Sequence, residues 1–133
     1  MPTLRELQAC FVRHERKHEG RPGIAPAGGN FGDPTTFDAM VRVEAIDQAQ
    51  GVRFLCPACF AKNGGARGTH MVVCWSRSRG VPDDVDPKPG RWTLHGTGID
   101  DLTLHGDPVG HARSVQLHGG CGWHGFVDNG SAA

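Results

Sequence analysis

The apolar residues at the start of the chain recur at the spacing of an amphipathic helix. They fall on one helical face, and Thr3 has the capping-box spacing to Glu6. A glycine and a proline that follow would end such a helix. The pattern therefore predicts an N-terminal amphipathic α-helix over residues 1–20, as an appendage to the rest of the chain. Its apolar face consists of Leu4, Leu7, Phe11 and Val12.

Beyond this segment the pattern changes twice. Residues 21–37 are rich in Gly and Pro without apolar periodicity, which is typical of a linker. From residue 38 onward apolar and polar residues alternate in short runs bounded by Gly, Pro or Asp, which predicts antiparallel strands. The sequence thus indicates a mainly β fold, with a small antiparallel β domain over residues 38–130. We expect strands at 40–46, 52–55, 70–76, 91–95, 102–105, 115–118 and 125–128.

Composition suggests that apolar packing is not the only source of stability. The chain has 133 residues, enough for one domain, but only 38% are hydrophobic, while 20 are Gly and 9 are Pro. Lys and Arg balance Asp and Glu at a formal net charge of zero, so no overall field attracts nucleic acid or an anionic membrane. No segment approaches the ~20 apolar residues of a membrane span.

Cysteine usage indicates a reducing compartment. The chain has five cysteines, an odd number, and charges at Arg5 and Glu6 stand where a secretory signal needs an apolar stretch. We therefore expect a cytoplasmic protein, in the host cell if the gene belongs to a phage. Paired cysteines in that compartment are more often metal ligands than disulfides.

Two short motifs have the spacing of metal-binding hooks. Cys56 and Cys59 flank Pro-Ala directly after an expected strand, so both thiolates can face one ion. Cys121 and His124 are separated by two residues in a turn rich in glycine, which allows the backbone to fold tightly. Three cysteines and one histidine form a common structural Zn²⁺ set. The sequence predicts such a site, which closes the β domain.

The fourth ligand is open, and so is the chemistry of the cysteines. His70 or Cys74 can take the place of His124, because positions 70, 72 and 74 share one face of a strand. A redox dithiol at Cys56 and Cys59 is a competing interpretation, although the βαβ context of such pairs is absent from the pattern. The remaining interpretation is that the cysteines are ordinary buried thiols.

Ser114 is the one candidate nucleophile that the sequence offers near the second hook. With His124 or His118 as the base, it would give a small hydrolase. Spacing alone supports this weakly, since any serine and histidine near a turn would qualify.

Together these motifs resemble a group of short phage and prophage proteins that often carry the label ammonia monooxygenase. Because the enzyme of that name is a large membrane assembly, we do not expect its activity here. The resemblance spans roughly residues 40–130 and is carried by FLCPACF (54–60), KNGG (62–65), GTH (68–70), GVPDD (80–84), GRW (90–92), DLTL (101–104) and GGCGWHGFV (119–127).

The same group is similar, more distantly, to a peptidase-like family of bacterial ubiquitin-like conjugation operons. The similarity places that family's three cysteines on Cys56, Cys59 and Cys121, and its histidine on His124. Its Leu-Thr-Leu strand falls on 102–104 and its serine on Ser114, with Arg113 in place of a proline. The resemblance implies a peptidase, whereas the departures around Ser114 weaken that implication.

Three functions follow from these patterns. The first is a metal-stabilised module that binds a host or phage protein through the long loop 79–90 and exposed tryptophans among Trp75, Trp92 and Trp123. The second is the zinc-containing hydrolase or peptidase that uses Ser114 and His124. Nucleic-acid binding ranks last, because acidic residues dilute both basic patches.

Overall fold

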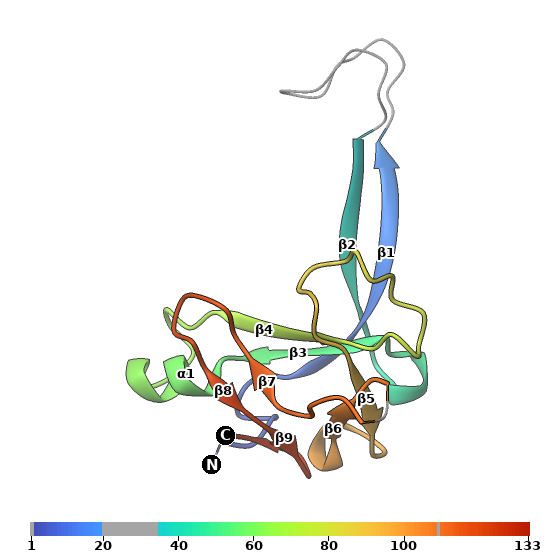
Figure 1. Cartoon of the computed structure of the whole chain (residues 1–133). Helices are drawn as coiled ribbons and strands as arrows, with labels where there is room; N and C mark the ends of the chain where they lie inside the picture. Colours follow the sequence, from blue (N-terminus) through green and yellow to red (C-terminus); the bar gives the residue numbers. More distant parts are fainter. Residues whose placement is uncertain (1, 20–34, 109) are drawn as a thin grey trace.

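The computed structural model describes residues 2–19, 35–108 and 110–133, and this part of the chain is mainly β. The largest sheet has four antiparallel strands in the order β2-β1-β3-β4. They are β1 (Cys10–Glu19), β2 (Thr35–Val43), β3 (Gly51–Leu55) and β4 (Met71–Trp75). Three two-stranded sheets lie below it in Figure 1. They pair β5 (Trp92–His95) with β6 (Thr103–Gly106), β7 (Val115–Gln116) with β8 (His124–Gly125), and β9 (Val127–Asp128) with β10 (Ser131–Ala132).

The predicted N-terminal helix is wrong, because a strand takes most of its place. The capping box forms, since the Glu6 N–H donates to Thr3 Oγ1 at 3.0 Å, and the Leu7 N–H donates to the Thr3 carbonyl at 3.0 Å. The backbone then leaves helical geometry at Gln8, which has a φ of 55°, and β1 starts two residues later. The initial turn buries Leu4 and Leu7 completely, so this segment belongs to the core.

Strands β1 and β2 form a long hairpin that projects from the rest of the molecule (Figure 1). The segment predicted as a linker lies outside the described residues up to position 34, and its last three residues belong to β2. The Arg16 guanidinium joins this hairpin to the loop 79–90 by pairing with both Asp38 and Asp84 at 3.0 Å.

The remaining predicted strands are present with shifted ends, and one element was not predicted. Residues directly after β3 form the helix α1 (Pro57–Asn63), and two single 3-10 turns occur at η1 (Ile46–Gln48) and η2 (Ile99–Asp101). Pro57 occupies the first turn of α1, where a backbone N–H would have no acceptor within the helix, so the lack of one in proline costs no hydrogen bond. Gly64 ends the helix in the left-handed region at φ 70°.

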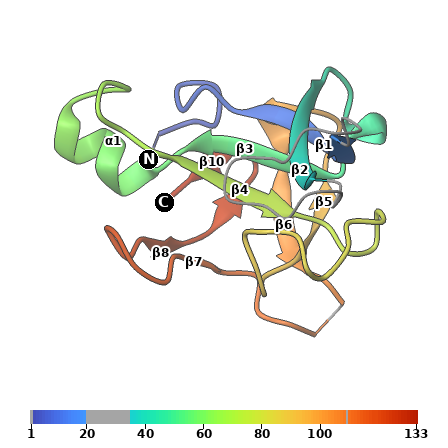
Figure 2. The same cartoon turned by 90° about the horizontal axis from the view of Figure 1, so that it is seen from above.

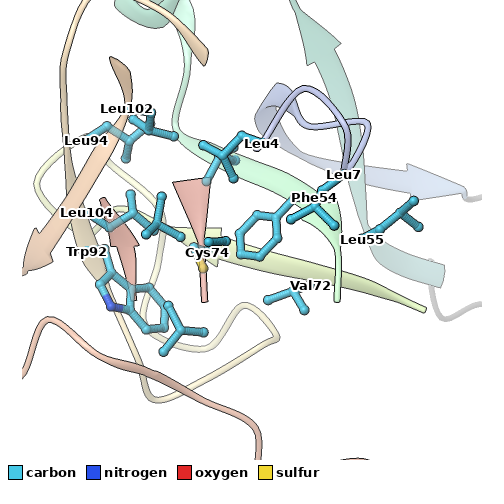
Figure 3. Packing of buried hydrophobic residues seen from close by; sticks show 14 of the residues in the cluster. Leu4, Leu7, Phe54, Leu55, Val72, Cys74, Trp92, Leu94, Leu102 and Leu104 are labelled. Carbon is cyan, nitrogen blue, oxygen red and sulfur yellow. The ribbon is translucent and has the colours of Figure 1, made fainter. Parts of the chain in front are cut away.

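The main core lies between the large sheet and the smaller ones (Figure 3). Phe54 of β3 is fully buried among leucines from the N-terminal turn and from β5 and β6. The two ends of the described chain meet beside this core, because the Leu4 N–H donates to the Gly130 carbonyl at 2.8 Å (Figures 1 and 2). Leu4, Leu7, Leu94, Leu102 and Leu104 form the leucine part of the cluster.

The loop 79–90 is folded around a buried arginine. Arg91 is only 4% exposed, and its two terminal nitrogens donate to four backbone carbonyls. The Trp75 indole N–H also donates to the Asp86 carbonyl at 2.8 Å. The loop is therefore ordered by hydrogen bonds from two flanking side chains that it surrounds. The four acceptors are Pro82, Val85, Pro87 and Gly90.

Candidate metal centre

The first hook forms where β3 passes into α1. Cys56 is the residue before the helix, and its carbonyl accepts from the Phe60 N–H at 2.8 Å, so Cys59 lies on the first helical turn. Backbone N–H groups of Ala58 and Cys59 point toward the Cys56 sulfur. The turn of the helix thus brings two thiols to one side and offers donors that stabilise a thiolate.

His70 lies directly across the sheet from Cys56. Leu55 pairs with Met71 in the β3–β4 register, and the Cys56 N–H donates to the His70 carbonyl at 2.9 Å one step further along. The His70 Nδ1 is 3.3 Å from the Met71 carbonyl, which can accept a hydrogen bond from a protonated Nδ1. In that tautomer Nε2 could bind a metal, the arrangement that orients metal-binding histidines.

Cys121 reaches the same place from the turn between β7 and β8. The glycines on either side of it have φ values of 57° and 67°, a region in which other residues are strained. Trp123, next but one, is buried edge-on against Phe54 of β3, with ring centroids 6.0 Å apart. The tryptophan fixes the hairpin on the core, and the glycines turn Cys121 toward the first hook.

Cys56, Cys59, His70 and Cys121 form one compact group. One sulfur or nitrogen atom from each lies within 4.8 Å of all the others. The Cys56 and Cys121 sulfurs are 3.6 Å apart, and His70 Nε2 is 3.4 Å from the Cys121 sulfur. Tetrahedral Zn²⁺ with bonds of ~2.3 Å to sulfur and ~2.0 Å to nitrogen requires about 3.8 Å between two sulfurs and about 3.5 Å between sulfur and nitrogen. The sulfurs are too far apart for a disulfide, which needs ~2.05 Å.

Two thiols of the group, those of Cys56 and Cys121, differ in acidity. Burial raises the pKa of Cys56 to about 11, against the opposing effect of the backbone N–H groups. The hydrogen bond from His70, followed by the Trp123 backbone N–H, lowers the pKa of the exposed Cys121 to about 6. The exposed Cys121 therefore loses its proton more readily than the buried Cys56.

The structure gathers the three predicted cysteines with His70, which the sequence offered as an alternative to His124. His124 is exposed on β8, opposite Gln116, and is not part of the group. Since side chains alternate along a strand, the inward position of Trp123 directs the next residue outward. The signal that favours His70 is its register with Cys56, which the sequence alone does not give.

Cys74, the other alternative ligand, lies in the core. It pairs with Val52 in the β3–β4 register and is fully buried, and burial raises the pKa of its thiol far above the usual range. Cys10 is also buried, beside Val12 and Trp75 in a smaller apolar cluster. Both thiols serve as packing residues.

Ser114 is half-buried just before β7 and lines a groove together with His118. Among the described residues no hydrogen bond joins its hydroxyl to a histidine. The structure thus places Ser114 and His118 in the lining of one groove without assembling a nucleophile and its base.

Comparison with known proteins adds no relative: no family, no curated protein and no solved structure matches the chain. In the described part of the chain, no helix combines the length and the apolar character needed to cross a bilayer.

Proposed function

We propose that this protein is a zinc-stabilised module that binds another protein, with Cys56, Cys59, His70 and Cys121 as the ligands of a structural Zn²⁺. The observation that carries the proposal is the convergence of four ligand atoms within 4.8 Å of one another. Three thiolates and one imidazole suit Zn²⁺ in type and number, whereas Ca²⁺ and Mg²⁺ require oxygen ligands.

The position of the group explains what a bound ion would contribute. Two ligands follow β3, one precedes β4, and one belongs to the β7–β8 turn, 65 residues from Cys56 in the sequence. Hydrogen bonds already join β3 to β4, whereas the β7–β8 hairpin contacts the core through side chains such as Val115 and Trp123, to which a bound ion would add a link at the turn. Zinc would therefore fasten the β7–β8 hairpin in place.

A binding role agrees better with this site than a catalytic one. Four protein ligands fill a tetrahedral site and leave no position for a reacting water. The surface carries large apolar side chains that a partner can cover, namely Phe37, Met40, Met71 and Phe126. If the resemblance to phage and prophage proteins holds, the partner is a host or phage protein.

Elemental analysis of the purified full chain tests the metal and its ligands. We expect one zinc per chain, retained in His124→Ala and lost in His70→Ala and Cys121→Ser. The two histidine variants form a matched pair, since both side chains are exposed and lie near the same turn. If His124→Ala loses zinc while His70→Ala keeps it, the ligand set is wrong. If the wild type holds no zinc after reconstitution, the proposal fails.

The hydrolase that uses Ser114 and His124 stays a prediction, with one observation in its favour. Ser114 and His118 both line a groove of about 550 Å³. A peptidase would lose turnover by orders of magnitude in Ser114→Ala while keeping its zinc and its melting temperature. A binding module would show no turnover of any peptide in either form.

A further inference from the structure

A groove of about 550 Å³ runs along β4, and nothing assigned above occupies it. One wall is the first half of β4, from Met71 to Val73. The opposite wall is the segment that leads into and out of β7, residues 114–118, and the end is formed by the loop 87–90. Apolar atoms make up most of its exposed lining. The proposed metal ligands His70 and Cys121 stand close to lining residues in the sequence, one residue before Met71 and three residues after His118.

The wall formed by β4 is an unpaired sheet edge. In the order β2-β1-β3-β4 this strand is the last, and among the described residues it pairs with β3 alone. In an antiparallel pair, backbone groups point alternately toward the partner strand and away from it. The Cys56 N–H donates to His70, and the Ser76 N–H donates to Gln50, so even-numbered residues of β4 face β3. The N–H and C=O groups of Val73 therefore point away from β3, at the side where the groove lies.

The charged side chains around the groove differ in whether they already have a hydrogen-bond or ion-pair partner. Arg77 pairs with Asp83 at 2.7 Å, and Arg91 is held by backbone carbonyls. Asp107 accepts from the Ser78 N–H at 2.7 Å and from the Ser76 hydroxyl at 3.2 Å. Lys88 is exposed at the rim, and within the described residues it makes no ion pair. Its ammonium is the available charge at this end, and it favours an acidic partner.

From these observations we propose that the groove binds an extended peptide segment of a partner protein, which adds to the edge of β4 as a fifth strand. The segment has alternating apolar residues that fill the groove and an acidic residue that meets Lys88. The inference rests on the proposed binding function and names its partner class. Strand addition uses main-chain hydrogen bonds for affinity and alternate side chains for specificity. The five residues of β4 span roughly 16 Å, which admits about five residues of the peptide.

The metal centre gives this groove its second wall. Residues 114–118 belong to the hairpin that Cys121 ties to the ends of β3 and β4. Without that link, only the packing of residues such as Val115 and Trp123 positions the hairpin, so this side of the groove is less firmly held. Peptide affinity should therefore depend on zinc, although no groove residue is a ligand.

The test uses the zinc-loaded full chain and fluorescein-labelled synthetic eight-residue peptides in which valine alternates with threonine. One peptide carries two glutamates at one end, a second carries them at the other end, and two matched peptides carry lysines instead. We expect fluorescence anisotropy to show that one glutamate peptide binds at least tenfold more tightly than its lysine counterpart. A peptide that pairs with a single sheet edge uses every second amide. N-methylation of those amides should abolish binding, and N-methylation of the amides between them should leave binding unchanged.

Variants of the protein locate the binding. Val73→Pro removes an N–H that faces away from β3, so the sheet can keep its own bonds while the edge loses a donor. We expect it to keep one zinc and to lose at least tenfold in affinity for the glutamate peptide. Lys88→Glu, an exposed change that does not threaten folding, should reverse the preference toward the lysine peptide. Lys62→Glu on α1, also exposed, is the matched control and should change neither.

The results separate this proposal from the one on which it rests. If the chain binds one zinc but no peptide, or if Val73→Pro and Lys88→Glu leave binding unchanged, the groove proposal is overturned while the metal centre stands. A zinc-dependent dimer in sedimentation that no peptide dissociates would show that β4 pairs with a second copy instead. Peptide binding at full affinity by a chain without zinc would support the groove and refute its dependence on the metal.

Discussion

Removal of the metal is the perturbation that tests the architecture most directly. His70 and Cys121 are exposed, so a strong chelator can reach the site without prior unfolding. The ion would link the β3–α1 hook to the β7–β8 turn across 65 residues. By the loop-closure relation for a cross-link, a loop of that length is worth roughly 4 kcal/mol at 25 °C. The link between Cys56 and His70 adds little, because backbone hydrogen bonds already join these residues.

This magnitude converts into a measurable change in melting temperature. For a domain of this size, 1 kcal/mol shifts Tm by about 3–5 °C, so chelation should lower Tm by roughly 12–20 °C. Calorimetry of the zinc-loaded chain with and without chelator measures the shift, and zinc added back should restore it. His124→Ala is the control and should show the same shift as the wild type. A Tm that changes by less than about 2 °C on chelation would refute the idea that a metal fastens the hairpin.

Three further predictions concern single groups. Zinc affinity should fall at least about tenfold for each pH unit lowered, because zinc must displace the proton of Cys56, whose pKa is about 11. The fall should become steeper below pH 6, where Cys121 also becomes protonated; competition titrations from pH 5 to 8 measure this, and a flat profile would contradict it. Phe54→Ala should lower the free energy of unfolding by about 3–5 kcal/mol in urea titrations, since the ring is fully buried against Trp123. A loss below about 1 kcal/mol would mean that Phe54 is not part of the core. Arg91→Met should lower the free energy of unfolding by at least about 3 kcal/mol and expose the loop 79–90 to proteolysis, because four carbonyls lose a charged donor. Unchanged protease resistance would show that the loop is ordered by other contacts.

Sequence patterns predicted the β part of the fold well because each strand signal is local. The run from Val52 to Leu55 and the run from Met71 to Trp75 are apolar and short, and both are strands of the large sheet. The N-terminal helix was wrong for an equally local reason. The spacing of Leu4, Leu7 and Phe11 suits a helix, yet it also fits a single buried turn followed by a strand with both faces covered. A positive φ at one residue, Gln8, separates the two outcomes.

The candidate metal centre shows where local reasoning stops. The pair Cys56 and Cys59 can be found from spacing, because both belong to one turn. The histidine cannot, since His70 and His124 both stand near a glycine-rich stretch and both are exposed. The choice depends on which residue faces Cys56 across two strands and on which side of β8 Trp123 packs. Both are tertiary facts.

The position of β4 at the edge of its sheet links the candidate metal centre to the proposed peptide groove. A sheet edge usually requires protection, and here the β7–β8 hairpin stands beside it without pairing to it. If the hairpin were held only by the contact of Trp123 with Phe54, it could pivot and either close on β4 or leave the edge open. A metal bound at Cys121 would add a second anchor two residues from Trp123 and would limit that movement. In our proposal, this added anchor keeps a space open between the hairpin and β4, as an edge that accepts a partner strand requires.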